Sequence, residues 1–117
     1  MYTDGLLALS KAGKVTNAAK TLNPGFSVIT FAAGSTEMYE FLHENPTIGM
    51  APVHYTNDPH IIRQNHRMVS INSALEVDLQ GQIVADTIGA RQYTGVGGHQ
   101  DFTEGTSFDL EHVSLIC

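Results

Sequence analysis

The stretch MVSINSALEVDLQGQIVADTIG, residues 68–89, carries the clearest secondary-structure pattern in this chain. Its apolar and polar residues alternate with the period of a β-strand that buries one face. The apolar set is Val69, Ile71, Leu75, Val77 and Leu79, and the polar set is Ser70, Asn72, Glu76 and Asp78. A second apolar run, Ile83–Ile88, follows Gln80-Gly81, where glycine can take the positive φ of a tight turn. The pattern predicts a β-hairpin with a buried apolar face.

A glycine-rich segment, YTGVGGHQDF at residues 93–102, follows the predicted hairpin. Because Gly95, Gly97 and Gly98 carry no side chains, their backbone N–H groups can approach an anionic or polarised oxygen closely. One glycine loop is weak evidence of function by itself. It does mark this segment as a candidate site.

The residue pattern in the first third of the chain predicts a short helix followed by a buried strand. The helix over 3–12 can begin with Thr3 or Asp4 as its N-cap and end at Gly13, since glycine is favoured at C′. The run Phe26–Ala33 is almost continuously apolar. Such a run is typical of a central strand that is buried on both faces.

Capping residues mark two further helices. Ser35 can cap a helix that Asn45-Pro46 ends, and Asp58 can cap a shorter helix that starts at Pro59. An extended piece, residues 48–53, lies between them. Strands therefore alternate with helices along the whole chain, which predicts the α/β class.

Composition excludes several classes of function. A length of 117 residues fits one domain, and a formal net charge of -6 argues against a nucleic-acid partner. No apolar run approaches the ~20 residues of a membrane span, and the N-terminus does not read as a signal peptide. We therefore expect an intracellular chain with no membrane contact. Cys117 is the only cysteine and the six histidines lack metal-ligand spacing, so no metal site is expected.

The hairpin and the glycine segment together resemble the C-terminal domain of the acetyl-CoA hydrolase and CoA-transferase family. Four further segments resemble that family in the same order: TDGLLAL (3–9), KVTNAAKTLNPG (14–25), FAAGSTEMYEFLHENP (31–46) and APVHYTNDPHIIRQN (51–65). The resemblance covers residues 1–105 and implies part of an open α/β sheet of the CoA-transferase (NagB/RpiA-like) type. Residues 106–117 depart from the family pattern, so we expect a divergent or truncated tail there.

The resemblance implies an enzyme that moves CoA between acetyl-CoA and a short carboxylic acid through a glutamyl-CoA intermediate. A glutamate carboxylate would attack the thioester. In the family this glutamate lies directly before the segment that Tyr2–Gly5 resembles, so it would precede Met1 and lie outside this chain. No permanently bound cofactor is implied, because the CoA thioester is a substrate. The expected partner is the missing N-terminal half or a second copy, in the cytoplasm or, in a eukaryote, the mitochondrion.

Within this chain the resemblance implies supporting roles. Gly98 would direct a backbone N–H at the thioester oxygen, and Asn57, Gly95 and Gly97 would join it in binding the acyl group or CoA. The alternative for the glycines is an ordinary turn. The alternative for Asn57 is a place in a helix cap beside Asp58.

The sequence allows alternative roles for several residues and for the chain as a whole. Glu76 and Asp78 could share a strand face as paired carboxylates, or form an acidic edge that faces solvent. Tyr93 and Phe102, which flank the glycine segment, are more typical of packing residues. The whole chain could instead be a non-catalytic α/β module or an inactive product that binds a CoA-like ligand or a partner chain. The sequence also leaves transfer and hydrolysis as alternatives.

Overall fold

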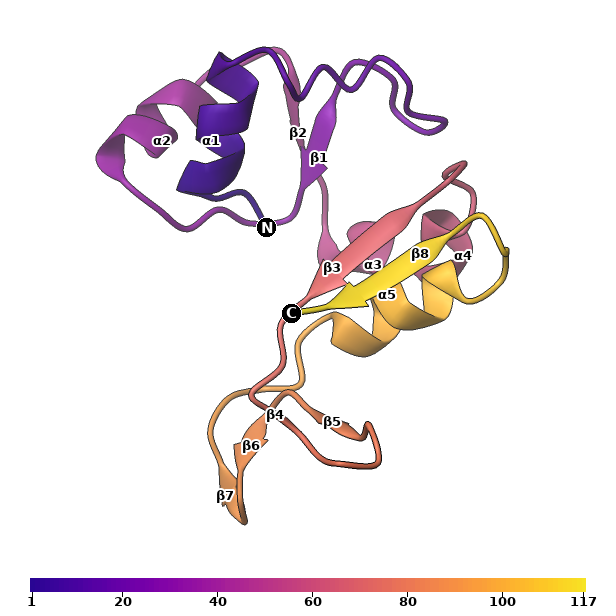
Figure 1. Ribbon diagram of the computed structural model, residues 1–117. Coiled ribbons are helices and arrows are strands. Elements are labelled where there is room, and N and C mark those ends of the chain that lie inside the picture. Colours follow the sequence, from indigo (N-terminus) through magenta and orange to yellow (C-terminus); the bar gives the residue numbers. More distant parts are fainter. The chain divides into compact units, whose positions relative to one another are not determined.

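The computed structural model describes residues 1–117 (Figure 1). The chain divides into two compact units, Met1–Thr56 and Asn57–Cys117. The helices are α1 (Asp4–Lys11), α2 (Thr36–Leu42), α3 (Val53–Thr56), α4 (Pro59–Ile62) and α5 (His99–Thr106). The strands are β1 (Ser27–Ile29), β2 (Ile48–Met50), β3 (Val69–Asn72), β4 (Glu76–Val77), β5 (Ile83–Val84), β6 (Thr87–Ile88), β7 (Arg91–Gln92) and β8 (Val113–Ile116). This mixture confirms the predicted α/β class.

The first unit combines a parallel two-stranded ribbon with a pair of helices that pack beside one another, α1 and α2 (Figure 1). β1 and β2 run parallel, and Tyr2 adds an isolated parallel bridge to Ala32. The buried core of this unit consists of Tyr2, Leu7, Ile29 and Met38. Burial of these apolar side chains is the main force that holds the ribbon and the helices together.

Local signals set the helix ends of this unit as predicted. Gly13 follows α1 with a φ of +67°, the left-handed conformation that favours glycine. Ser35 caps α2, since its Oγ accepts a hydrogen bond from the Met38 N–H at 3.3 Å. α2 ends at Leu42, shortly before the predicted stop at Asn45-Pro46.

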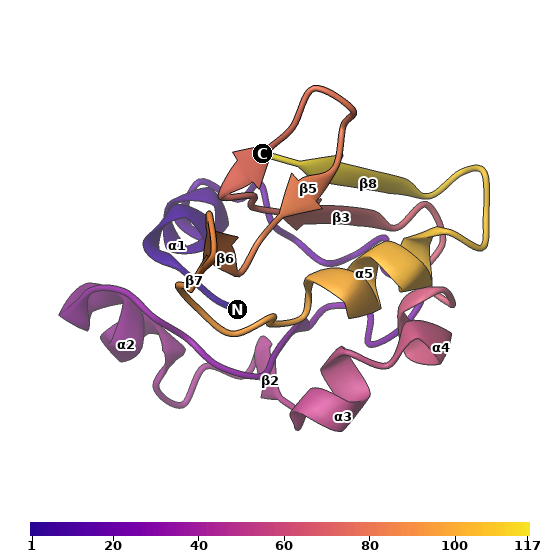
Figure 2. The same cartoon turned by 90° about the horizontal axis from the view of Figure 1, so that it is seen from below.

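The second unit is built on a parallel ribbon of β3 and β8, with α5 packed against it (Figure 2). Ser70 and Ser114 lie opposite each other in this ribbon, with their hydroxyl oxygens 2.9 Å apart, and Ser70 is buried whereas Ser114 is exposed. α5 also packs against α4, where a Cβ added to Gly105 would lie 2.5 Å from Ile62 Cγ2. α5 therefore depends on the glycine at position 105 to approach α4 closely.

Two antiparallel hairpins lie between β3 and α5 in the sequence. β4 pairs with β5, and Gly81 turns between them with a φ of +82°. This is the predicted hairpin, confirmed at its centre. The next pair, β6 and β7, departs from the prediction, because the structure divides the apolar run Ile83–Ile88 into two strands, β5 and β6, and β6 pairs with β7.

The prediction of one long strand over residues 69–79 is wrong. β3 ends at Asn72 and pairs with β8, 44 residues further along the chain, while β4 begins again at Glu76. The predicted buried face is also wrong for β3, since Ser70 is 3% exposed and Ile71 is 69% exposed. The cause is tertiary, because α5 packs against β3, and the residue of this strand that becomes buried is the small Ser70 rather than an apolar neighbour.

The prediction of a central strand over Phe26–Ala33 is also wrong. Only residues 27–29 form a strand, and β2 is its one partner in the ribbon. Phe26 and Phe31, at either side, are 44% and 52% exposed. Apolar composition indicated burial correctly at Ile29 but overstated it for the residues that flank β1.

The C-terminal residues, expected to diverge from the family, contain β8. Val113–Ile116 pairs in register with β3, from Val69 opposite Val113 to Asn72 opposite Ile116. The division of the chain at residue 105 stays a prediction. None of the helices is both long and apolar enough to cross a bilayer.

Candidate active site

The structure brings together two of the predicted site residues, Asn57 and Gly98, at the start of α5. Gly98 is the N-cap of this helix, with a φ of −93° that any residue can adopt. A Cβ added there would nevertheless come within 3.0 Å of Asn57 Nδ2 and 3.5 Å of Asn57 Cγ. Gly98 is therefore required by the position of Asn57 rather than by its own backbone conformation.

Asn57 is held in this position by Asp101, in the first turn of α5. The Asn57 Nδ2 donates a hydrogen bond to Asp101 Oδ2 at 3.1 Å. Sequence reasoning missed Asp101. The signal that could have found it is its spacing, because an acidic residue three positions after an N-cap is favoured by the helix dipole. Asp58, the next residue, caps α4 by accepting from the His60 N–H at 2.8 Å, so a place for Asn57 beside this cap stays an alternative to a binding role.

Backbone amides gather at this end of α5. The first N–H groups of a helix have no acceptor within it, and together they form its positive end. The Phe102 N–H is the first to bond within the helix, to the Gly98 carbonyl at 3.2 Å. The start of α5 is thus chemically suited to an oxygen that carries or develops negative charge.

The other two glycines differ from Gly98. Gly97 has a φ of +64°, so its glycine is explained by the left-handed turn into α5. A Cβ added to Gly95 would meet nothing within 4 Å. The binding roles assigned to Gly95 and Gly97 stay predictions.

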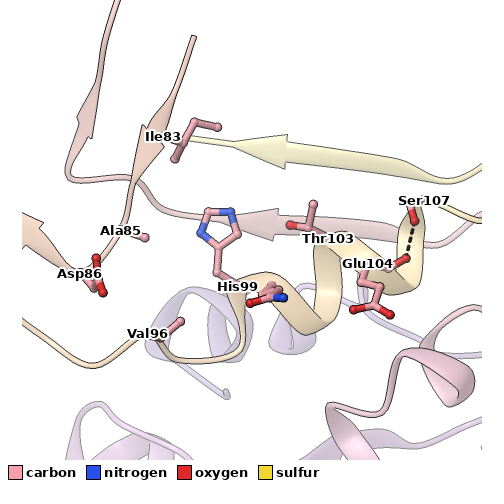
Figure 3. A pocket seen from close by; sticks show the side chains of 9 residues that line it. Ile83, Ala85, Asp86, Val96, His99, Thr103, Glu104 and Ser107 are labelled. Carbon is pink, nitrogen blue, oxygen red and sulfur yellow. Dashed lines mark hydrogen bonds between the residues drawn. The ribbon is translucent and has the colours of Figure 1, made fainter.

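A cavity of about 530 Å³ lies between the hairpin segment and one side of α5 (Figure 3). Its walls are Ile83, Ala85, Asp86, Val96, His99, Gln100, Thr103, Glu104 and Ser107. Val96 and His99 flank Gly97 and Gly98 in sequence, so the cavity adjoins the glycine segment. Sequence reasoning missed it, although the residues of α5 involved follow the i, i+4 spacing of one helix face.

The cavity is mixed in character. Ile83, Ala85 and Val96 supply apolar surface, whereas Asp86 and Glu104 place two carboxyl groups on its walls. Carboxylates repel an anionic ligand. The cavity therefore suits an uncharged group better than a phosphate or a free carboxylate.

The residues next to the chain start are firmly held within the first unit. The Tyr2 N–H donates to the Phe31 carbonyl, and the Ala33 N–H donates to the Tyr2 carbonyl, both at 3.0 Å. Two residues on, the Asp4 carboxylate accepts hydrogen bonds from Ser35. These bonds hold the pKa of Asp4 below its ordinary value, because they stabilise the ionised form.

Glu76 and Asp78 have structural roles in the hairpin. Asp78 Oδ1 accepts from the N–H groups of Gln80 and Gln82, each at 2.8 Å, and so stabilises the turn. Glu76 Oε1 accepts from the Gly89 N–H at 3.3 Å. Both residues are exposed, which favours the solvent-facing alternative over paired catalytic carboxylates.

Tyr93 and Phe102 differ in their surroundings. Tyr93 is 66% exposed, so it is not a buried packing residue in this chain. Phe102 is partly buried, with its ring 3.6 Å from the position of a Cβ on Gly98. No group of three or more His, Cys, Asp or Glu side chains lies close enough together to hold a metal ion.

Comparison with known proteins adds sequence evidence. Residues 34–117 match the family model described as the acetyl-CoA hydrolase/transferase C-terminal domain. The chain is 45% identical over 117 residues to the 4-hydroxybutyrate coenzyme A transferase of Clostridium kluyveri, covering 100% of this chain and 27% of that protein. It is 42% identical to the probable butyrate:acetyl-CoA coenzyme A-transferase of Syntrophomonas wolfei, covering 100% of this chain and 26% of that protein.

Solved structures agree with this relationship. RipA from Yersinia pestis superposes with a TM-score of 0.88 at 46% identity, covering 97% of this chain and 26% of that chain. The 4-hydroxybutyrate CoA-transferase from Porphyromonas gingivalis superposes with a TM-score of 0.82 at 37% identity, covering 99% of this chain and 26% of that chain. The chain thus spans about a quarter of the length of the relatives it matches.

Proposed function

This chain belongs to the acetyl-CoA hydrolase/transferase C-terminal domain family, and we propose that it forms part of an enzyme that moves CoA between acetyl-CoA and a short carboxylic acid. Relatives named as CoA-transferases, at 45% and 42% identity across the chain, support the reaction class. The contact between Asn57 and Gly98 is the observation that carries the assignment of a site to this part of the enzyme.

The proposed reaction starts with a glutamate located just before Met1. Its carboxylate attacks the acyl-CoA carbonyl and the C–S bond breaks. The CoA thiolate departs, and the glutamate and the acyl group are joined as a mixed anhydride. The thiolate then attacks the glutamyl carbonyl, which releases the first carboxylate and forms a glutamyl-CoA thioester. A second carboxylic acid reverses both steps and takes the CoA. No proton, reductant or metal is needed to balance this exchange.

The role proposed for Gly98 follows from its place at the positive end of α5. Negative charge develops on the thioester oxygen during attack, and a backbone N–H donor aimed at such an oxygen is worth about 3 kcal/mol in other enzymes. An amide on a helix start needs little reorganisation. Gly98 would supply this donor, with Gly97 setting the turn that presents it.

Asn57 is proposed to contact the acyl or CoA group beside Gly98. Asp101 fixes one of its amide hydrogens by accepting from Nδ2, which orients the side chain. Because the amide group is planar, the same hydrogen bond also fixes the direction of the Asn57 side-chain oxygen. The adjoining cavity, with its apolar residues Ile83, Ala85 and Val96, is proposed to receive an uncharged portion of the substrate.

Transfer is favoured over hydrolysis by the names of the relatives, whereas the family description includes both. The decisive difference is whether water reaches the glutamyl thioester. Isotope-labelled acetate supplied to the full-length enzyme with acetyl-CoA would measure transfer as label in acetyl-CoA, and released free CoA would measure hydrolysis.

The same assay tests the function itself. Exchange of label by the full-length enzyme, with none by residues 1–117 alone, is the expected result. Binding of CoA without exchange or hydrolysis in the full-length enzyme would instead support the non-catalytic module. Exchange by residues 1–117 alone would contradict a nucleophile located before Met1.

A further inference from the structure

The Asp4 carboxylate joins the start of α1 to the start of α2. Its Oδ1 accepts the Ser35 hydroxyl at 2.6 Å, and its Oδ2 accepts the Ser35 N–H at 3.1 Å. The same hydroxyl oxygen accepts from the Met38 N–H at 3.3 Å, so one serine links the carboxylate to the first turn of α2. Asp4 and Ser35 are both exposed, so this pair of charge-assisted hydrogen bonds is notable for its direction rather than for its strength.

Gly34 leaves the space that this arrangement needs. A Cβ added to Gly34 would lie 2.7 Å from Asp4 Oδ2 and 2.9 Å from Met38 Sδ. Met38 is fully buried and cannot give way easily. A side chain at position 34 would therefore displace the Asp4 carboxylate. The glycine at this position leaves room for the contact between Asp4 and Ser35.

Tyr2 fixes the same short segment from its other end. Its backbone bonds to Phe31 and Ala33 on both sides, and its side chain is 1% exposed. The ring stacks on Phe41 with centroids 6.4 Å apart. Residues 2–4 are thus held by the extended chain after β1 and by α2, so the residue that precedes Met1 would extend from a rigid base.

Helix stabilisation alone does not explain the direction of the Asp4 side chain. Asp4 is the first residue of α1, where an acidic side chain already interacts favourably with the helix dipole. That interaction needs no specific partner on α2. Yet the carboxylate is turned onto Ser35, whose backbone and side chain it both engages.

We propose that Asp4 is a positioning residue for the nucleophilic glutamate, holding the chain at Tyr2–Asp4 against α2 so that the carboxylate upstream of Met1 stays aligned with the thioester. This rests on the proposed function, which places that glutamate just before Met1. Misplacement of a reacting group by about 1 Å can cost about 100-fold in rate. A displaced main chain would therefore act on the acylation step rather than on substrate binding.

The test uses the full-length enzyme and follows formation of the glutamyl-CoA adduct in a single turnover. Asp4→Asn should lower kcat and the adduct-formation rate together by roughly 10- to 100-fold, with KM changed less than about threefold. Glu37→Gln is the matched control, because Glu37 also lies in the first turn of α2 and pairs with Lys11 of α1. It should leave both rates near the wild-type values.

Ser35 provides a second pair of variants in case Asp4→Asn does not fold. Ser35→Ala removes the hydroxyl that Asp4 accepts and should slow adduct formation, whereas Ser35→Thr keeps a hydroxyl and should restore it. If Asp4 and Ser35 had only a structural role, these variants would lower the melting temperature, but they would not lower kcat while leaving KM nearly unchanged.

The outcomes separate the two proposals. Wild-type adduct on the glutamate before Met1, with Asp4→Asn or Ser35→Ala as fast as wild type, would overturn the positioning role alone. Absence of any adduct there in a turning-over wild-type enzyme would overturn the proposed function, and the positioning role with it.

Discussion

Asn57 and Gly98 lie in contact at the start of α5, so closely that the side-chain nitrogen of Asn57 occupies the space a Cβ on residue 98 would need. The backbone of Gly98 is compatible with any residue. The glycine is therefore coupled to the asparagine, and each position has to be interpreted through the other.

This coupling predicts a non-additive pair of substitutions. Gly98→Ala should lower turnover of the full-length enzyme by roughly 10- to 100-fold, because the new Cβ displaces Asn57 and shifts the donor by a fraction of an ångström. Asn57→Ala should also lower turnover. The double variant should be no slower than Asn57→Ala by more than about threefold, since the overlap has been removed. A double-mutant cycle of kcat/KM measures this, and additive losses would refute the coupling.

Asp101 should act through Asn57. Asp101→Asn replaces an ionised acceptor with a neutral amide, which weakens the bond from Asn57 Nδ2 and removes an acidic residue from the first turn of α5. We expect a loss of about 0.3–1 kcal/mol in stability from the helix dipole, together with a fall in kcat/KM smaller than that of Asn57→Ala. Thermal unfolding and steady-state kinetics check the two parts. A larger kinetic loss than Asn57→Ala would mean that Asp101 contacts substrate itself.

Gly105 offers a test of packing between α5 and α4. Gly→Ala inside a helix ordinarily stabilises a protein by about 0.5–1 kcal/mol. At Gly105 the added methyl would overlap Ile62 Cγ2, only 2.5 Å away, so a net destabilisation of about 1–3 kcal/mol is expected instead. Gly5→Ala is the control, because Gly5 also lies in a helix, α1, and a Cβ there meets only Thr3 Oγ1, at an ordinary contact distance of 3.8 Å. Melting temperatures of the two full-length variants give the answer, and a stabilised Gly105→Ala would contradict this packing.

The pKa of Asp4 should depend on Ser35. Hydrogen bonds from the Ser35 side chain and backbone lower it, so the stabilising contribution is present above the ordinary aspartate value of about 3.9 and is lost as the pH falls through the lower, folded-state pKa. Ser35→Ala should raise the pKa of Asp4 toward the ordinary value. NMR titration of the carboxyl carbon measures this directly. An unchanged pKa would show that the hydroxyl bond is absent in solution.

Sequence reasoning succeeded where structure is determined by a few neighbouring residues. The caps at Ser35 and Asp58, the helix end at Gly13 and the turn at Gly81 all form as predicted. Each depends on the φ preference or the capping hydrogen bond of a single residue, and both follow from the type of that residue.

Contacts between residues that are distant in the sequence could not be predicted from these local preferences. The burial of Ser70 instead of Ile71 depends on which face of β3 receives α5, more than 25 residues later in the chain. Alternation alone cannot choose between two faces. Asp101 and the cavity beside α5 were missed for the same reason. Their spacing within α5 is a local pattern, but the segments that they face, Asn57 for Asp101 and residues 83–86 for the cavity, lie far away in the sequence. Asn57 and Gly98 were nominated together through the family resemblance.

The central claim is that this chain supports a nucleophile carried by the residue just before Met1. Mass spectrometry of the full-length enzyme, trapped during turnover with acetyl-CoA and digested, tests it most directly. We predict a CoA-derived adduct on a glutamate immediately upstream of Met1. An adduct on Glu76 or Asp78 instead, or rapid turnover with no protein adduct, would contradict the account.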